Sequence, residues 1–320
     1  MSEEAVAYRC EKCGAPIEVT PETIVAVCEY CGHPNWISEV KEEILIVASA
    51  SKDAVERSFR QRIEEDFDLR RVKDKISIIE ISGVYVPFYF VTVKAEAAYE
   101  GYIKKVERVG SGKKARWVTR REKVRGSFRS VLKLPILARR SAEDFSIKEL
   151  AGHYKYSKPE SIKLEEVDWE KVKLPVLNAE LSSDEAAEIA RDEAGDKMRA
   201  RAESKVDELI EFHCVTKVLS ISPLILIPYW YLVYSCGRAQ YRAAYAGWNC
   251  HLLAIQEPVL IYHRALYFIG ALLGCGLSAF GLAFSNNLNL SMGIGLLVLG
   301  AGISYAFGRK MVSDVRIERG

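Results

Sequence analysis

Four cysteines near the start of the chain have the spacing of a metal site. Cys10 and Cys13 form one CxxC pair, and Cys28 and Cys31 form a second pair fourteen residues further on. Four thiolates in two such pairs suit tetrahedral Zn²⁺, which binds sulfur at about 2.3 Å. Because protein ligands fill all four positions, none remains for a substrate, and we expect a structural site.

The residues around the cysteines favour a zinc ribbon, a small β-rich module. Gly14 and Gly32 directly follow the two pairs, and glycine permits the positive φ that a tight metal-binding turn needs. The segment between the pairs is rich in β-branched residues, as a small hairpin would be. We therefore predict a zinc ribbon over residues 1–40, with zinc as the cofactor. A redox dithiol pair and an iron site are the alternatives.

Two uncharged segments near the other end have the length of membrane spans. Residues 265–285 and 288–308 contain no charged side chain, and about 21 residues of helix cross a hydrocarbon core of about 30 Å. Gly270 and Gly274 form a GxxxG pair that would let two helices approach closely. We predict a transmembrane helical hairpin over 263–310; the alternative is a pair of buried helices in a soluble core.

The charges that flank these spans predict their orientation. His263 and Arg264 precede the first span, Arg309 and Lys310 follow the second, and the turn between them carries no positive charge. Since Lys and Arg are enriched on the cytoplasmic side of membrane proteins, both termini should be cytoplasmic. The predicted location is the cell membrane, with residues 311–320 as a cytoplasmic tail.

Between these ends, residues 41–262 read as an α+β domain of two similar halves with antiparallel strands. Each half has an apolar strand, a Ser-capped helix and a strand pair around a Pro-aromatic motif: VPFYF in the first half and IPYWY in the second. Val55, Phe59, Ile63 and Phe67 share one face of the first helix at four-residue spacing. Gly195 is expected to break the second helix. The apolar run 221–236 is shorter than a span and reads as a buried strand.

A basic segment lies between the two halves. Residues 104–140 hold fourteen Lys or Arg against two Asp or Glu, although the net charge of the whole chain is only +2. We predict a long basic β-hairpin over 102–134, turning at 110–112. It is a solvated face, a surface for anionic lipid headgroups, a nucleic-acid-binding surface or a surface for an acidic protein. The candidate lipid- or nucleic-acid-binding residues are Lys104, Lys105, Lys113, Lys114, Arg116, Arg120, Arg121, Lys123, Arg125 and Arg129.

No catalytic motif stands out. The chain has no HExxH, no GxSxG and no complete dinucleotide fingerprint, and the GSGKK stretch lacks the first glycine and the final Ser or Thr of a phosphate-binding loop. The neighbours His213 and Cys214 do not form a dyad by themselves, because adjacent strand residues point to opposite faces. We therefore expect a protein that is not an enzyme.

The knuckles CEKCG and CEYCG resemble prokaryotic zinc ribbons of the transcription-factor-B or primosomal type. A ribbon, two Pro-aromatic strand motifs and C-terminal spans together look like a family of uncharacterised prokaryotic zinc-ribbon membrane proteins. That resemblance implies a membrane adaptor for a peripheral partner, in a family with links to envelope stress. It transfers only the four cysteines as site residues.

These features lead to two main hypotheses of different classes, and a membrane enzyme with a site in a cleft between the two halves is a third. The first is a membrane-anchored zinc-ribbon adaptor or scaffold whose cytoplasmic domain binds a protein partner; a second copy of the chain is a further candidate partner. The second is a membrane-tethered nucleic-acid-binding protein that uses the ribbon and the basic hairpin.

Overall fold

The computed structural model describes residues 6–20, 22–37, 42–109, 116–140, 145–169, 174–258, 261–287, 290–312 and 315–319. The chain forms two compact units, and each unit combines separate stretches of sequence. Unit 1 contains residues Met1–Ser49 and Gly83–Tyr229, and unit 2 contains Ala50–Ser82 and Trp230–Gly320. The fold is mixed α+β with largely antiparallel strands, as the sequence predicted, and it ends in two apolar helices.

The first part of unit 1 is a cysteine module, residues 6–37, made of two small antiparallel hairpins. In each hairpin a CxxC pair lies in or next to the connection between the strands. The module is too small to bury a sizeable core of its own, so its few buried residues depend on the cysteine cluster and on the rest of unit 1. Its strands are β1 (Val6–Arg9), β2 (Pro16–Val19), β3 (Val25–Val27) and β4 (Pro34–Trp36).

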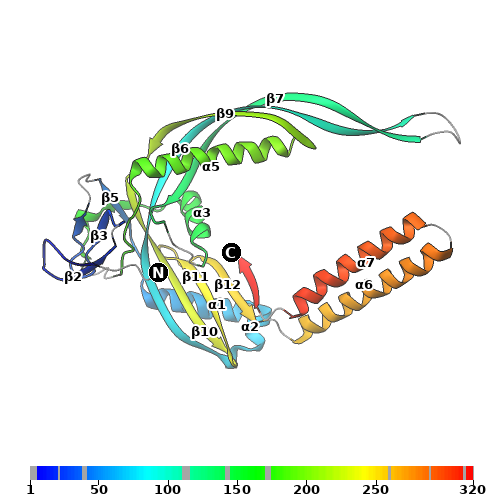
Figure 1. Cartoon of the computed structure of the whole chain (residues 1–320). Coiled ribbons are helices and arrows are strands. Elements are labelled where there is room, and N and C mark those ends of the chain that lie inside the picture. The colour runs from blue at the N-terminus through cyan, green and yellow to red at the C-terminus, as the bar shows by residue number, and fades with distance from the viewer. Residues whose placement is uncertain are drawn as a thin grey trace. The chain divides into compact units, whose positions relative to one another are not determined.

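The main sheet of unit 1 is built on the second part of β6 (Ile76–Val109). This part pairs with β7 (Arg116–Leu137) on one side and with β9 (Glu208–Ile221) on the other. Helix α5 (Ser183–Glu203) lies along these strands (Figure 1). Val91, Val93, Ala95 and Ala97 are buried on one face of β6, while Lys94 on the other face is exposed. The side chains of this strand therefore alternate between a buried face and a more exposed one.

Smaller elements complete unit 1. β5 (Ile44–Val47) pairs in parallel with the start of β10 (Leu224–Cys236), and β8 (Ser161–Lys163) pairs antiparallel with β5. The first seven residues of β10 are buried, so the predicted buried strand is confirmed for residues 224–236 of the apolar run 221–236, while Ile221 ends β9. The remaining helices are α3 (Ile147–Ser157) and the 3-10 turn η3 (Leu164–Glu166).

Unit 2 packs α1 (Lys52–Glu65) on the end of β10, where the rings of Phe59 and Tyr234 are 4.9 Å apart. Val55, Phe59 and Ile63 are buried, which confirms the predicted apolar face. Phe67 is 55% exposed, so its predicted place on that face is wrong: α1 ends at Glu65, and Phe67 begins α2. The unit also contains α2 (Phe67–Arg71), η1 (Lys73–Lys75), β11 (Ala239–Ala246), β12 (Leu252–Pro258) and β13 (Val315–Arg319).

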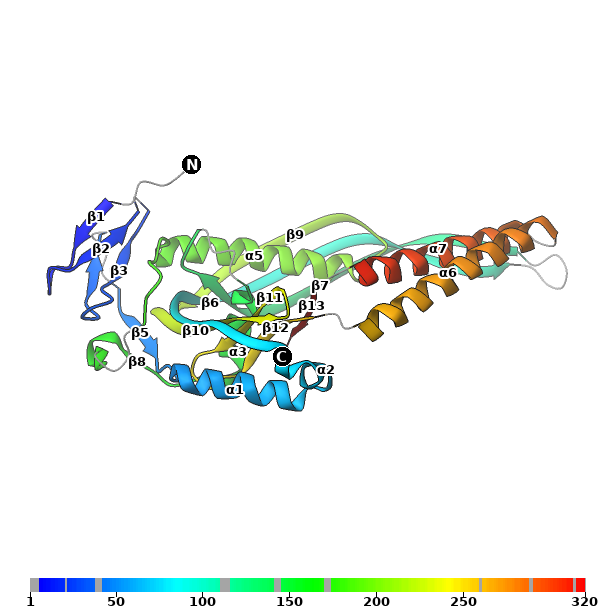
Figure 2. The same cartoon turned by 90° about the horizontal axis from the view of Figure 1, so that it is seen from below.

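The last two helices, α6 (Ile261–Asn287) and α7 (Leu290–Val312), form a hairpin whose helices lie side by side in both views (Figures 1 and 2). Their apolar stretches Ala265–Ala283 and Met292–Lys310 are each long and apolar enough to cross a membrane. Ser278 Oγ donates to Leu297 O at 3.1 Å, and Ser304 Oγ donates to Ala271 O at 3.0 Å. Only 11% of each stretch is buried, so the large apolar side chains mostly face outward.

Two paired strands flank the helical hairpin in the sequence. β12 ends directly before α6, β13 follows α7, and the two strands pair antiparallel from Pro258↔Val315 to Ala254↔Arg319. The ends of the two helices are therefore held next to each other by backbone hydrogen bonds. Most of the predicted tail, residues 311–320, belongs to α7 or to this strand.

Strands of the two predicted halves pair with each other. The apolar strand of the first half, β5, pairs in parallel with the Pro-aromatic strand of the second half, β10. Reciprocally, Val176 of the second half forms a parallel bridge to Tyr85 of the first. The strand pair predicted for the first half is a single strand, because β6 continues through Ser82-Gly83. In the second half the pair is present: Pro223, which lacks an N–H, separates β9 from β10.

Candidate metal centre

The four predicted cysteines come together at one point of the cysteine module. Cys10 Sγ lies 3.6 Å from Cys31 Sγ, and Cys13 Sγ lies 3.7 Å from Cys28 Sγ. All four sulfurs lie within 4.8 Å of one another, and none of them forms a disulfide. A tetrahedron with metal–sulfur bonds of about 2.3 Å has edges of about 3.8 Å. The donor set and its spacing therefore fit a tetrahedral metal ion.

Both CxxC pairs have the same backbone geometry. Gly14 N donates to Cys10 O at 2.9 Å, and Gly32 N donates to Cys28 O at 2.8 Å. The two glycines have φ values of +75° and +68°, a left-handed conformation that a residue with a Cβ adopts only at a cost. The glycine that follows each pair is thus needed for the turn that aims the sulfurs inward.

The thiols differ in their readiness to ionise. Burial acts to raise the pKa of Cys10, but the backbone N–H groups of Cys13 and Lys12 outweigh it and lower the pKa to about 6. Burial raises the pKa of Cys28, and it raises that of Cys31 to about 12. A bound cation would stabilise all four thiolates together, because metal ligation requires deprotonated sulfur.

Asn35 joins the two hairpins, and the sequence analysis missed it. Its side chain is fully buried, and its Oδ1 accepts a hydrogen bond from Glu11 N at 2.9 Å. Its Nδ2 donates to His33 O at 2.9 Å and to Ala26 O at 3.3 Å. The amide therefore links the first CxxC pair to the strands of the second. An asparagine in a polar-looking stretch gives no signal of this role.

Trp169 fixes the second CxxC pair to the rest of unit 1. Its indole Nε1 donates to Glu29 O at 2.9 Å, and its ring packs on Gly32, where an added Cβ would lie 2.5 Å from the indole. Backbone hydrogen bonds join Ile24 N to Ala179 O at 2.7 Å and Ala179 N to Val25 O at 3.1 Å. The cysteine module is therefore docked on the side of its second CxxC pair. Cys13 and Tyr30 stay exposed.

The basic segment forms an extended β-hairpin, because β6 and β7 pair from Phe88↔Leu137 to Val109↔Arg116. The predicted turn and the candidates Lys113 and Lys114 lie outside the described residues, and Arg116 opens β7. Lys104 and Lys105 lie on β6, and Arg120, Arg121, Lys123, Arg125 and Arg129 lie on β7. Five of these residues have a carboxylate partner: the pairs are Lys105–Glu122, Arg121–Glu208, Lys123–Glu100, Arg125–Glu100 and Arg129–Glu96.

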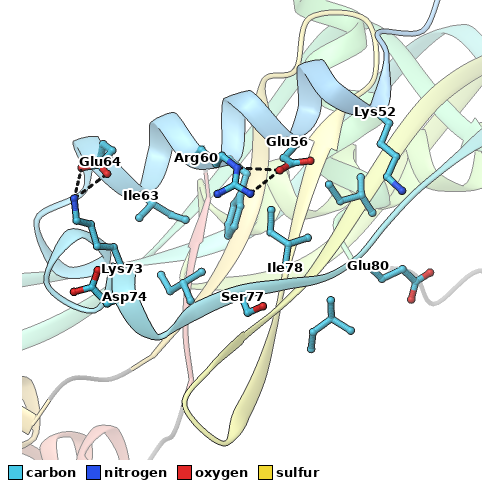
Figure 3. A pocket seen from close by; sticks show the side chains of 14 residues that line it. Lys52, Glu56, Arg60, Ile63, Glu64, Lys73, Asp74, Ser77, Ile78 and Glu80 are labelled. Atoms are coloured by element: carbon cyan, nitrogen blue, oxygen red, sulfur yellow. Dashed lines mark hydrogen bonds and ion pairs between the residues drawn. The ribbon is translucent and has the colours of Figure 1, made fainter.

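A hollow of about 770 Å³ in unit 2 lies between α1, η1 and the start of β6 (Figure 3). Two ion pairs lie along its rim, Arg60 with Glu56 at 2.7 Å and Lys73 with Glu64 at 3.1 Å. Ile76 and Ile78 line its wall on the strand side. The hollow thus presents surface ion pairs and aliphatic groups rather than a convergent catalytic set among the described residues.

Comparison with family models, with curated proteins and with solved structures finds no match to the chain.

Proposed function

We propose that the chain is a membrane-anchored zinc-ribbon adaptor, a non-enzymatic protein that presents a cytoplasmic surface to a protein partner. The observation that supports this most is the four-sulfur cluster of Cys10, Cys13, Cys28 and Cys31. Such a centre with only protein ligands serves structure, and structural zinc contributes about 10–16 kcal/mol of apparent binding energy to folding. Zinc is the metal that this donor set fits best.

The partner surface in this proposal is the exposed part of the ribbon. Trp169 and Ala179 contact the second hairpin through Glu29, Gly32 and the backbone of β3, and the exposed Cys13 and Tyr30, the latter 62% exposed, remain for a partner. An exposed aromatic side chain on a rigid support is typical of protein-binding surfaces.

The anchor in this proposal is the α6–α7 hairpin, inserted in the cell membrane with both termini in the cytoplasm. Its outward apolar side chains and its glycine-lined helix contact support a membrane environment, where close packing replaces the hydrophobic drive. The family resemblance adds the expectation of a role in envelope stress.

The nucleic-acid hypothesis remains as the alternative. Trp117 is 71% exposed on the basic hairpin, and an exposed aromatic ring among cations can stack on a base. Five of the candidate cations already have carboxylate partners, which reduces the positive charge available to phosphates.

The first test is metal content and partner capture by the tagged full-length chain in native membranes. The unsubstituted chain should hold about one zinc per chain and crosslink to a discrete protein. Cys28→Ser should lose both and still insert in the membrane. Cys214→Ser, the same chemical change on β9, is the matched control and should lose neither. Capture of the same partner by Cys28→Ser would reject the adaptor proposal.

A further inference from the structure

The outer part of the basic hairpin extends beyond its neighbouring strand. β9 pairs with β6 only as far as Tyr102↔Glu208, whereas the pairing of β6 with β7 continues to Val109↔Arg116. Residues 103–109 and 116–122 therefore pair only with each other among the described strands. A two-stranded ribbon is marginally stable in water by itself, so a surface that covers one face would stabilise it.

The two faces of this extension differ in charge. Residues directly opposite each other share a face, and successive residues alternate between faces. One face, called here the tryptophan face, carries two cations and no carboxylate among its described side chains. The opposite face carries two cations and two carboxylates. The tryptophan face consists of Lys104, Val106, Trp117, Thr119 and Arg121, and the opposite face of Ile103, Lys105, Glu107, Val118, Arg120 and Glu122.

The tryptophan face also exposes its apolar side chains more fully, since Ile103 and Val118 of the opposite face are half-buried. Trp117 is 71% exposed and Val106 is 61% exposed, and they occupy diagonal positions of the ladder. Lys104 lies directly opposite Arg121, and like charges in that position repel each other. The neighbouring carboxylates belong to the base of the extension, where Glu208 lies 3.3 Å from Arg121. An exposed pair of this kind contributes little to stability.

We propose that the tryptophan face binds an anionic lipid surface, as a second attachment besides the helical hairpin. Tryptophan is enriched at the membrane–water interface, where its ring contacts the headgroup region. Lys and Arg near an anionic leaflet are attracted to it. The exposed aliphatic Val106 favours a lipid boundary over a nucleic acid, because bases stack on aromatic rings rather than on aliphatic groups. The inference rests on the proposed membrane anchor.

The fluorescence of Trp117 measures this lipid contact. The chain has five tryptophans, and Trp117 is the exposed one; Trp169 and Trp230 are buried, and Trp36 and Trp248 are partly buried. The full-length chain would be reconstituted in nanodiscs of phosphatidylcholine alone or with phosphatidylserine. With phosphatidylserine, Trp117 emission should shift to shorter wavelength and resist acrylamide quenching. The same experiment on Trp117→Phe gives the background emission of the other four tryptophans.

Matched double variants test which face binds. Lys104→Gln/Arg121→Gln removes two cations from the tryptophan face, and Lys105→Gln/Arg120→Gln removes two from the opposite face. Since each cation near an anionic surface contributes about fivefold in affinity, the first variant should weaken the binding of the tryptophan face to the lipid surface by about 25-fold. The second should weaken it much less. Equal losses from both variants would overturn the assignment to one face.

The remaining outcomes separate this inference from the proposed function. A chain that does not insert in nanodiscs refutes the membrane anchor itself. A chain that inserts, but whose Trp117 signal is independent of phosphatidylserine, overturns only the lipid contact. Protection of Trp117 by an oligonucleotide in neutral nanodiscs, without an effect of phosphatidylserine, would overturn the lipid contact and favour the nucleic-acid alternative.

Discussion

At the scale of single residues, the cysteine module depends on a buried amide as well as on its sulfurs. Asn35 makes three hydrogen bonds, to Glu11 N, His33 O and Ala26 O, with none of its side chain exposed. Removal of the amide would leave these backbone groups without their partner. A buried polar group that loses its partner costs about 1–3 kcal/mol.

We therefore expect Asn35→Ala to lower the free energy of unfolding of the module by about 1–3 kcal/mol. Chelator-induced metal release and thiol reactivity of the full-length chain would measure this change. Asn178→Ala is the matched control, because Asn178 donates one hydrogen bond, to Glu18 O, and is only half-buried. Equal sensitivity of the two variants would contradict the role given to Asn35.

A second feature at this scale is a buried carboxyl group whose pKa is set by its neighbours. Glu257 on β12 is 2% exposed, and its Oε1 lies 3.3 Å from Arg62 Nη2. The same guanidinium lies 3.3 Å from Asp66 Oδ2 and 3.0 Å from Glu318 Oε1, so one cation faces three carboxylates. Burial, followed by the charges of Asp66 and Glu318, raises the pKa of Glu257 to about 7.

The raised pKa has a consequence for stability against pH. Because the folded state holds this proton more tightly than the unfolded state, the stabilisation is complete below the ordinary pKa of 4.5. It decreases as the pH rises and is lost above the folded-state pKa of about 7. We expect Glu257→Gln to flatten the decline in unfolding temperature between pH 4.5 and pH 7, about the ordinary and the folded-state pKa of Glu257. Glu185→Gln should not do so, because the pKa of Glu185 is lowered and its contribution is lost only in acid. An unchanged slope in Glu257→Gln would refute the assignment.

At the scale of elements, the helical hairpin is held by the close approach of glycines. A Cβ added at Gly274 would lie 2.6 Å from Ser304 Oγ, and one added at Gly300 would lie 2.5 Å from Gly274 O. A Cβ added at Gly276 or at Gly295 would have no such neighbour within 4 Å. The helices therefore contact each other through one glycine-lined face, and the GxxxG pair of the sequence lies on it.

Gly274→Leu and Gly300→Leu should force α6 and α7 apart, whereas Gly276→Leu and Gly295→Leu should be tolerated. Overpacking of a tight contact costs about 1–3 kcal/mol. Thermal unfolding of the chain in detergent would show the difference. If the control variants unfold as early as the others, the contact between the helices does not depend on these two glycines.

The sequence predicted elements well where one local pattern dominates. The apolar face of α1 is confirmed at Val55, Phe59 and Ile63, and the serine caps of both helices are confirmed at Ser51 and Ser182. The predicted break at Gly195 is wrong, because α5 runs through it. One interior glycine costs a helix only about 1 kcal/mol, and the alanines around it and the packing of the helix on the sheet offset that cost.

At the scale of the whole molecule, the sequence could not predict contacts between distant segments. The spacing of the cysteines predicts the metal cluster, since the ligands and the turns are local. The contact of Trp169 with Gly32, by contrast, joins residues far apart in the chain and follows from no periodicity. The same holds for the parallel pairing of β5 with β10, which crosses between the predicted halves.

The strand pair around the helical hairpin also constrains the order of events during synthesis. β13 comes after both apolar helices in the chain, yet it completes the sheet edge next to β12. The ribosome must therefore deliver α6 and α7 before that edge can close. Until then β12 is an open edge strand, which is prone to pair with other chains. Synthesis of both helices must therefore precede the final step of folding, so a slow passage through them would leave a nascent chain open to aggregation.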